Sequence, residues 1–359
     1  MRVLLLTTDA YGGHGGIALY NRDIVDALAA SADVSEVVVV PRTLKFAVAG
    51  VPDKVRFIAA AAGSKFRFVR AAFAAARGHF DLVICGHINL LPLAAALNLK
   101  LRAPLALMIY GIDAWTRPGF WTRRRLRRVD AIWSISAITR DRMIEWSGMA
   151  ESKFVLLPNA IHLDRYGMAE KRADLVARYR LQGRKVIMTL ARLPSFERYK
   201  GVDEVIEVMP ALIEQEPTLA YLVTGDGDDR PRLEAKARML GLEDRVIFTG
   251  LVEEAEKADH FRLADAFVMP GRGEGFGFVF LEALACGVPV VGSLVDGSRE
   301  ALLDGELGEL ADPANPLSIR ECILQALSKP KAIPEGLSYF SWPHFRLRLA
   351  AAVNSLTHT

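Results

Sequence analysis

Residues 269–291 read MPGRGEGFGFVFLEALACGVPVV. An apolar strand is predicted to end at Met269-Pro270, a glycine-rich loop follows, and an apolar run predicts a helix that begins near Gly277. Such a loop can offer several backbone N–H groups to an anion, because it stands at the positive end of the helix. A strand, a glycine loop and a helix in this order are typical of a nucleotide-binding α/β domain.

Two carboxylates stand in the same stretch. Glu274 lies in the glycine loop, and Glu282 lies eight positions later, inside the predicted helix. Apolar residues surround Glu282, so its carboxylate needs a hydrogen-bonding partner. Beside an anion site, the two carboxylates can accept hydrogen bonds from sugar hydroxyls or stabilise developing positive charge.

Short apolar runs alternate with amphipathic segments along the whole chain, which predicts parallel sheets with helical crossovers. In the first half, strands are expected at Arg2–Thr7, Glu36–Val40, Val55–Ala59, Asp81–Cys85, Leu105–Ile109, Ala131–Ser134 and Phe154–Leu157. In the second half, strands are expected at Lys185–Leu190, Ala220–Thr224, Arg245–Phe248, Ala266–Met269 and Val288–Val291.

The pattern restarts after the turn at Pro158-Asn159 and the polar stretch that follows it. We therefore expect an α/β protein of two doubly wound, Rossmann-like domains that face a cleft, at residues 1–165 and 166–339. The length of 359 residues suits two domains. The amphipathic segment Trp342–Leu356 has no strand after it. We therefore expect residues 340–359 to form a helix that packs back on the N-terminal domain.

The composition excludes several classes of protein. A chain with 51% hydrophobic residues is not disordered. Cys85, Cys286 and Cys322 cannot all pair and lack metal-ligand spacing, so neither a disulfide scaffold nor a zinc module is expected. The N-terminal apolar run is too short for a secretory signal, and no run reaches the roughly 18 apolar residues of a membrane span. A cytoplasmic protein is expected.

The net charge of +3 hides an asymmetry between the two halves. Residues 1–165 hold 22 basic and 13 acidic residues (22−13=+9), and the remainder holds 23 and 29 (23−29=−6). The basic excess lies in Lys65–Phe73 and Trp115–Arg128, where cations alternate with aromatic residues. Such segments suit the inner face of an anionic membrane or a diphosphate-linked acceptor. The alternative is two solvated helix faces with the aromatic rings turned inward. No nucleic-acid-binding module is visible, so nucleic acid is not an expected partner.

A second glycine loop follows the first strand, where residues 9–16 read DAYGGHGG. Gly13, Gly15 and Ala18 have the spacing of a dinucleotide fingerprint. That fingerprint needs an acidic residue at the end of the second strand, but this strand ends at Pro41-Arg42, and Arg42 suits only a 2′-phosphate. An NADP-dependent oxidoreductase therefore stays open as an alternative, as does a glycine turn that only packs a helix on a strand.

The spacing from Glu274 to Glu282, with GFG after the first and EALACGVPVV around the second, closely resembles the retaining GT-B glycosyltransferases of family 4. Further landmarks of that family match in the right order along most of the chain: the glycine loop at 12–16, Leu157-Pro158-Asn159, Ala191-Arg192, Tyr199-Lys200-Gly201 and Thr224-Gly225-Asp226-Gly227. The resemblance implies a GT-B fold, with an acceptor-binding N-terminal domain and a nucleotide-sugar-binding C-terminal domain.

The resemblance also implies roles for individual residues. Arg192 and Lys200 would hold the diphosphate of a nucleotide-sugar, which agrees with the need for fixed positive charge at a departing diphosphate; without partners, both would be ordinary surface cations. Glu274 would contact the hydroxyls of the donor sugar, and Glu282 those of the ribose. The remaining donor-binding candidates are Gly13, Gly15, Gly16, Gly225, Gly227, Ile247, Gly275, Phe276 and Gly277.

One position departs from the family pattern. Many relatives have a histidine before the Gly-x-Asp/Glu turn that follows the fifth strand, and Tyr110 stands there in this chain. A phenol can donate or accept a hydrogen bond but carries no positive charge. Asp113 and His87 are further candidates on the acceptor side; a turn residue and a helix cap, respectively, are the structural alternatives.

A metal site is a further possibility in the second half. Asp226, Asp228 and Asp229 include an Asp-x-Asp pair, and carboxylate oxygens suit magnesium or manganese. The same aspartates can favour the start of the next helix. We expect neither a metal ion nor a cofactor, since the nucleotide-sugar is a substrate.

The overall expectation is a retaining hexosyltransferase that moves a sugar from a UDP- or GDP-sugar to a saccharide or lipid-linked saccharide, in bacterial polysaccharide or glycolipid biosynthesis. No residue is an obvious nucleophile, so the resemblance implies a front-face reaction. A nucleotide-sugar epimerase or a sugar-phosphate synthase of the same fold remains an alternative, because a fold does not determine a function.

Overall fold

The structure, a computed structural model, describes residues 1–13 and 15–357 and divides into two compact units. Unit 1 comprises Met1–Ala160 and the C-terminal segment from Trp342, and unit 2 comprises Ile161–Ser341. The division falls a few residues from the expected boundaries at 165 and 339. Ile161 and Ser341, the first and last residues of unit 2, form an isolated parallel β-bridge. The chain therefore enters and leaves unit 2 at neighbouring positions.

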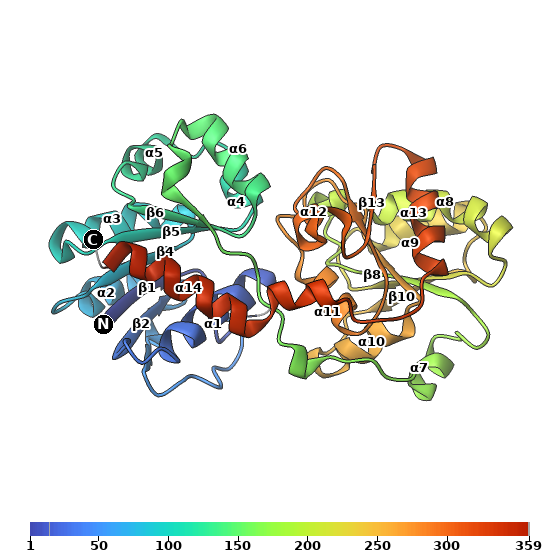
Figure 1. The fold of residues 1–359 in the computed structure, drawn as a ribbon, viewed down its shortest axis with the longest axis horizontal. Coiled ribbons are helices and arrows are strands. Elements are labelled where there is room, and N and C mark those ends of the chain that lie inside the picture. Colours follow the sequence, from blue (N-terminus) through green and yellow to red (C-terminus); the bar gives the residue numbers. More distant parts are fainter. Residues whose placement is uncertain (14, 358–359) are drawn as a thin grey trace. The chain divides into compact units, whose positions relative to one another are not determined.

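Unit 1 is built on a parallel sheet with the strand order β3-β2-β1-β4-β5-β6-β7 (Figure 1). Its strands are β1 (Arg2–Thr7), β2 (Glu36–Pro41), β3 (Val55–Phe57), β4 (Leu82–Gly86), β5 (Leu105–Ile109), β6 (Ala131–Ser134) and β7 (Phe154–Leu156). The central strands β4 and β5 are buried along their whole length, as expected for a parallel sheet covered on both faces.

The helices of unit 1 are α1 (Gly16–Ala29), α2 (Lys65–Ala75), α3 (Leu91–Leu101), α4 (Ile112–Trp115), α5 (Phe120–Leu126), α6 (Ala137–Ser147) and α14 (Trp342–Thr357). The C-terminal helix α14 packs against α1 (Figure 1), and the ring of Phe345 meets that of Tyr20 edge to face. Among the described residues, no helix is long and apolar enough to span a membrane.

Unit 2 has a parallel sheet with the order β10-β9-β8-β11-β12-β13. Its strands are β8 (Val186–Leu190), β9 (Ala220–Thr224), β10 (Val246–Gly250), β11 (Ala266–Val268), β12 (Val290–Ser293) and β13 (Glu309–Ala311). Its helices are α7 (Ala173–Arg178), α8 (Val202–Gln215), α9 (Arg230–Met239), α10 (Lys257–Leu263), α11 (Phe278–Ala285), α12 (Ser298–Ala301) and α13 (Pro316–Ser328). The predicted fold class, two doubly wound α/β units, is therefore confirmed.

The predicted strands differ from the observed ones mainly at their ends. The strand expected from Val288 begins at Val290, because the Val288 N–H turns back to the carbonyl oxygen of Ala283 at the end of α11. The strand expected to run to Ala59 stops at Phe57, and a 3₁₀ turn covers Ala59–Ala61. Strand β13 was not predicted, because three residues are too few to show a pattern.

In each sheet the strand order reverses at one position. In unit 1 this point lies between β1 and β4, and in unit 2 it lies between β8 and β11. Loops at the carboxyl ends of two such strands run to opposite sides and leave a crevice between them, where doubly wound proteins bind ligands. The loops after β8 and β11 carry Lys200 and Glu274, and the loops after β1 and β4 carry Gly13 and His87.

Candidate functional site

The loops after β8 and β11 are joined by an ion pair. Lys200, at the end of a 3₁₀ segment (Ser195–Lys200), donates from Nζ to Oε2 of Glu274 at 2.5 Å. The two side chains are only 18% and 19% exposed. Burial lowers the pKa of Lys200, but the Glu274 carboxylate outweighs that effect and raises the pKa overall. Lys200 therefore stands at the switch point as a fixed positive charge.

Close backbone contact holds the same two loops together. Tyr199 accepts at its carbonyl oxygen a hydrogen bond of 2.8 Å from the Arg272 N–H. Gly201 has a φ of +85°, and a Cβ at this position would lie 2.7 Å from the carbonyl oxygen of Pro270. The glycine of the Tyr199-Lys200-Gly201 motif is therefore required by the left-handed backbone and by the approach of the second loop.

The glycine loop leaves backbone donors available beside this ion pair. No described residue accepts a hydrogen bond from the N–H groups of Gly275, Phe276 or Gly277, which precede α11. Glu274 itself is anchored: its N–H donates to Asp296 at 2.9 Å, and its carbonyl oxygen accepts from the Gly297 N–H at 2.8 Å. The loop thus presents three N–H groups and the Lys200 ammonium in one short segment, which suits an anion such as a diphosphate.

Asp296 is a site residue that sequence reasoning missed. It lies in the loop after β12, is buried, and accepts hydrogen bonds from Glu274 and from Ser298. The Asp-Gly-Ser order at 296–298 is typical of a turn that begins a helix, which is the only signal that the sequence holds for it.

Arg192 has a different environment from Lys200. Its guanidinium pairs with the buried carboxylate of Glu197 at 2.5 Å, within its own loop, and its side chain is 75% exposed. The structure thus brings Lys200 and Glu274 into contact, whereas Arg192 lies on the exposed side of the loop after β8 and pairs with Glu197.

Glu282 has the partners that its apolar surroundings demanded. Its Oε1 accepts hydrogen bonds from Lys257 Nζ at 2.6 Å and from the Tyr166 hydroxyl at 2.7 Å. Burial lowers the pKa of Lys257, and the carboxylates of Glu282 and Glu254 outweigh it and raise that pKa overall. Lys257 and Tyr166 come from distant segments of the chain, so the sequence held no signal for this cluster.

The turn after β9 closes against the loop after β8. Gly225 has a φ of +129°, and a Cβ there would lie 1.9 Å from the carbonyl oxygen of Ala191, so only glycine fits. Gly227 packs in the same way against Leu193. Ile247 lies on the neighbouring strand β10, which pairs with β9. Gly225 and Gly227 therefore follow the end of β9, whereas Ile247 lies near the start of the adjacent strand β10.

The aspartates of the possible metal site bind protein groups. Asp228 accepts from the N–H and hydroxyl of Ser195, and Asp229 pairs with Arg198 and Arg232. Asp226 accepts from the Gly227 N–H. Within residues 1–13 and 15–357, no group of three His, Cys, Asp or Glu side chains is arranged to hold a metal ion.

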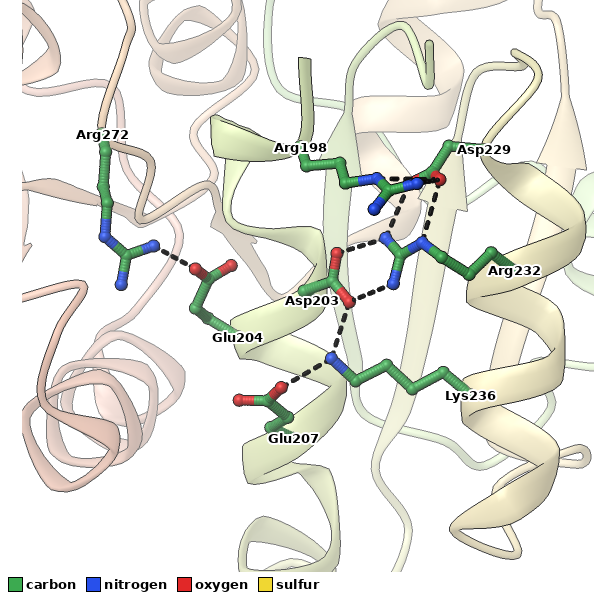
Figure 2. Close-up of polar contacts among 8 residues, drawn as sticks. All are labelled: Arg198, Asp203, Glu204, Glu207, Asp229, Arg232, Lys236 and Arg272. Atoms are coloured by element: carbon green, nitrogen blue, oxygen red, sulfur yellow. Dashed lines mark hydrogen bonds and ion pairs between the residues drawn. The ribbon is translucent and has the colours of Figure 1, made fainter. Parts of the chain in front are cut away.

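The first turns of α8 anchor both site loops through ion pairs (Figure 2). Asp203 pairs with Arg232 of α9, which also holds Asp229, and Asp229 holds Arg198, two residues before Lys200. Glu204 pairs with Arg272, two residues before Glu274. Lys236 completes the network with Asp203 and Glu207.

In unit 1, Tyr110 joins the ends of three strands. Its hydroxyl lies 2.6 Å from Asn21 Oδ1, to which it donates, and 2.9 Å from the carbonyl oxygen of Gly86. Asn21 donates in turn to the carbonyl oxygen of Asp9 at 2.8 Å. Burial raises the pKa of Tyr110, so the phenol stays neutral. Asn21 is a second residue that the sequence analysis missed, because it lies in a helix with no motif.

The glycine loop after β1 is described except for His14, which lies outside the described residues. Gly13 packs against the Asp9 carboxylate, where a Cβ would lie 2.0 Å from Oδ2. Gly15 precedes α1 and Gly16 is its first residue, so the loop leads into a helix N-terminus as predicted. The structure leaves the donor-side role of the three glycines as an expectation.

The two remaining acceptor-side candidates have local structural partners. His87 caps a 3₁₀ turn through Nδ1, which accepts from the Asn89 N–H at 3.1 Å, and burial lowers its pKa. Asp113 accepts from the Tyr110 N–H at 3.0 Å, whereas its buried Oδ2 has no partner among the described residues. Burial raises the pKa of Asp113 to about 7.

Solved structures with the same arrangement define the class of fold. A crystal structure of HepE from Anabaena in complex with UDP superposes with a TM-score of 0.76 at 20% identity and covers 99% of this chain and 100% of that one. WaaG, a glycosyltransferase involved in lipopolysaccharide biosynthesis, superposes with a TM-score of 0.63 at 18% identity over the full length of both chains. The two Rossmann-like units are those of the GT-B fold.

Both halves of the chain also match family models. Residues 14–165 match the model "Glycosyltransferase Family 4", and residues 175–335 match "Glycosyl transferases group 1". The chain therefore belongs to the group 1 glycosyltransferases of family 4, as the motif resemblance implied.

Among curated proteins, the GDP-mannose-dependent alpha-(1-6)-phosphatidylinositol monomannoside mannosyltransferase of Mycolicibacterium smegmatis is 34% identical over 233 residues, 61% of this chain and 60% of that protein. The D-inositol 3-phosphate glycosyltransferase of Geodermatophilus obscurus is 30% identical over 224 residues, 59% of this chain and 49% of that protein. The matched region thus spans about half to three fifths of the length of these relatives.

Proposed function

We propose that the protein is a retaining glycosyltransferase that moves a sugar from a nucleotide-sugar to a saccharide or lipid-linked saccharide. The observation that carries this proposal is the Lys200–Glu274 ion pair beside the three available N–H groups of Gly275, Phe276 and Gly277. A partly buried cation and a set of preorganised N–H groups provide what a departing nucleoside diphosphate requires, which is fixed positive charge in a partly water-excluded site.

The residues would act in the following way. When the diphosphate enters, Lys200 exchanges its bond to Glu274 for a phosphate oxygen, and the exposed Arg192 turns in beside it. Glu274 then accepts hydrogen bonds from the hydroxyls of the donor sugar. Glu282, held by Lys257 and Tyr166, binds the ribose hydroxyls. The residues of β9, β10 and the turn after β9 complete the donor site within unit 2.

The reaction itself needs no covalent enzyme intermediate. The bond from the anomeric carbon to the diphosphate oxygen breaks, the acceptor hydroxyl oxygen bonds to the same face of that carbon, and the hydroxyl proton passes to the leaving diphosphate. Arg192 and Lys200 supply the positive charge that a metal ion supplies in other transferases, so we propose transfer without a metal cofactor. Activity that persists in a metal chelator would support this point, and activity lost in the chelator and restored by magnesium would overturn it.

A GDP-sugar is the donor that we propose to test first, because curated relatives that are 34% and 32% identical to this chain are named as GDP-mannose-dependent enzymes. The HepE structure contains UDP, so a UDP-sugar is the competing choice. The names of the curated relatives also make an inositol-containing glycolipid the first acceptor to try. We propose a role in bacterial glycolipid or polysaccharide synthesis at the cytoplasmic side of a membrane.

A thermal-shift screen against GDP-mannose, UDP-glucose, UDP-galactose and NADPH tests the proposal directly. Stabilisation by one nucleotide-sugar, followed by transfer to an added acceptor with retention at the anomeric carbon, is the expected result. Stabilisation by NADPH alone would favour the oxidoreductase alternative. Conversion of the nucleotide-sugar to an isomer without any acceptor would favour an epimerase.

A further inference from the structure

A cavity of about 350 Å³ opens in unit 2 at the amino edge of its sheet. Three of its lining residues stand just before strands: Lys185 precedes β8, Thr218 precedes β9 by two residues, and Asp265 precedes β11. The basic residues of the cavity are Lys171, Arg184, Lys185, Lys329 and Lys331. We call this cavity the lysine pocket.

The lysine pocket is separate from the donor site. Strands β8, β9 and β11 are parallel, so their amino ends lie at one edge of the sheet and their carboxyl ends at the other. Lys200 and Glu274 stand in the loops after the carboxyl ends of β8 and β11. The five residues of β8 that separate the two edges span about 16 Å. A small ligand in the lysine pocket therefore contacts neither Lys200 nor Glu274.

The lysine pocket carries an excess of positive charge in the half of the chain that is otherwise acidic. Three carboxylates pair with three of its five cations: Asp265 with Lys171 at 2.7 Å, Glu216 with Lys185 at 2.8 Å, and Glu309 with Lys329. Two positive charges are left over. Cations gathered in a concave surface attract an anion strongly.

Arg184 and Lys331 carry the two remaining charges. Nη1 of Arg184 donates to the carbonyl oxygen of Asp244, and no carboxylate of residues 1–13 and 15–357 forms an ion pair with this guanidinium. Nζ of Lys331 donates to the carbonyl oxygen of Arg262 at 3.0 Å and lies 3.8 Å from Asp265. Both oxygens of that carboxylate already accept from another lysine, so Lys331 has no carboxylate of its own.

The electrostatic environment of Lys331 shows that the pocket lacks negative charge. The side chain is 29% exposed. Burial and the neighbouring ammonium of Lys171 lower the pKa of Lys331, and the carboxylates of Asp265 and Glu170 do not outweigh these two effects. An anion in the pocket would supply the missing charge and stabilise the ammonium form of Lys331.

We infer that the lysine pocket binds the phosphate group of a small soluble phosphomonoester, with Arg184 and Lys331 as its charged contacts. A guanidinium can pair with two phosphate oxygens at once, and an ammonium binds phosphate as a point charge. Lys171 keeps its partner Asp265 and does not need to move.

The size and lining of the lysine pocket restrict the kind of ligand. At about 30 Å³ per water, the cavity holds about ten waters, so it has room for a phosphate and an attached group such as a sugar ring. Of the described lining residues, only Leu327 is apolar and none is aromatic. This lining favours a soluble ligand over a bilayer surface. The inference concerns unit 2 alone and does not depend on the transferase activity.

Thermal unfolding of the whole chain tests the inference without any nucleotide-sugar, so its failure is distinct from a failure of the proposed function. The probes are inorganic phosphate and mannose 6-phosphate at constant ionic strength, with neutral mannose as the control. Both phosphates are expected to raise the Tm in a saturable way, because a ligand of the folded state stabilises it. Tighter binding of mannose 6-phosphate would assign the pocket to sugar phosphates, and tighter binding of inorganic phosphate would assign it to the free ion. No saturable rise with either would overturn the inference.

The double variant Arg184→Gln, Lys331→Gln is expected to raise the half-saturating phosphate concentration about 100-fold, since each charged contact contributes about a factor of ten. The matched control is Arg178→Gln, Arg238→Gln, which removes the same two charges at exposed residues of unit 2 outside the pocket. It is expected to bind phosphate like the wild type. Equal loss in both double variants would reduce the effect to overall charge and overturn the inference.

The variant Lys200→Met separates the lysine pocket from the donor site. It removes the cation of the donor site and is expected to keep the stabilisation by phosphate. Stabilisation that is lost in Lys200→Met but kept in Arg184→Gln, Lys331→Gln would place the phosphate at the donor site and overturn the inference.

Amine labelling of the wild-type protein gives a second readout that does not require a variant to fold. An N-hydroxysuccinimide ester acylates neutral amines, and peptide mass spectrometry gives the rate at each lysine. Phosphate is expected to slow the acylation of Lys331 about tenfold, which corresponds to a rise of its pKa by about one. Lys236, which two carboxylates hold outside the pocket, serves as the internal control. Equal acylation of Lys331 with and without phosphate would overturn the inference.

Discussion

Arg232 forms a bidentate ion pair with Asp203: Nη1 lies 2.8 Å from Oδ1, and Nη2 lies 2.5 Å from Oδ2. The same guanidinium holds Asp229 at 2.6 Å, and Asp229 holds Arg198 (Figure 2). Helices α8 and α9 and the loop that carries Lys200 are thereby linked through one side chain. A planar, two-pronged cation is needed for this, and lysine cannot replace it.

We expect Arg232→Met to weaken the binding of GDP or UDP about tenfold, because the loop before Lys200 loses an anchor and the ammonium is less well placed. Isothermal titration calorimetry measures the effect. Lys236→Met is the control, since Lys236 lies on the same helix and contacts Asp203 and Glu207 but not Asp229. An equal loss of affinity in both variants would show that the loop is not positioned through Arg232.

Substitutions of Lys200 and of Glu274 are expected to affect nucleotide binding differently. Lys200→Met should weaken nucleoside diphosphate binding about 100-fold, because a charge-assisted contact to phosphate is lost. Glu274→Gln should leave that binding intact or tighter, because the competing carboxylate is gone, while transfer falls by at least about 100-fold.

Equilibrium binding and initial-rate measurements on both variants separate these outcomes. Lys171→Met provides the control, because it breaks another half-buried lysine–carboxylate pair of unit 2, with Asp265 at 2.7 Å. If Glu274→Gln weakened nucleotide binding as much as Lys200→Met, the exchange of partners by Lys200 would be contradicted.

Gly201→Ala is expected to lower the free energy of unfolding by about 2 kcal/mol more than Gly183→Ala does. Both glycines have a positive φ, so in both variants the left-handed backbone of the alanine lowers the free energy of unfolding. Only at Gly201 does the added Cβ meet another backbone, that of Pro270, whereas nothing lies within 4 Å at Gly183. Urea denaturation of the two variants gives the difference, and equal losses would mean that the loops after β8 and β11 are not in close contact.

The buried carboxyl of Asp113 is expected to make stability depend on pH. Its pKa is about 7 in the folded protein and close to the ordinary 3.8 in the unfolded chain. The folded state therefore binds a proton that the unfolded state has released, so the contribution of Asp113 to stability is full below about pH 4 and is lost as the pH rises toward 7. The loss amounts to about 4 kcal/mol in total.

Asp113→Asn removes this dependence, because an amide does not titrate. Urea denaturation between pH 4 and pH 8 gives the free energy of unfolding of the wild type and of the variant. The titrations of other groups cancel in the difference between the two. The difference should fall as the pH rises and level off above 7. A constant difference would show that Asp113 ionises normally in the folded protein.

The parts of this fold that the sequence predicted are those with a local cause. The strands up to β12 show as apolar runs, and the glycine loops show because close backbone approach excludes other residues, as at Gly201 and Gly225. The site residues that the sequence did not predict are those that hydrogen-bond to a predicted residue from a distant part of the chain. Asp296 supports Glu274 from 22 positions away, and Asn21 meets Tyr110 across 89 positions, so neither pairing has a signal in one sequence. Glu282 shows both cases: its need for a partner was predictable, but Lys257 and Tyr166 were not.

The helix α14 has a consequence for the order in which the chain can assemble. Unit 1 is completed by residues that are synthesised after the whole of unit 2, since α14 follows Ser341 and packs on α1. During translation, the surface around Tyr20 that Phe345 covers stays open to water and to chaperones until α14 leaves the ribosome. Unit 2, by contrast, is one uninterrupted stretch and can close first. Unit 2 can therefore fold before unit 1, whose two segments flank it in sequence.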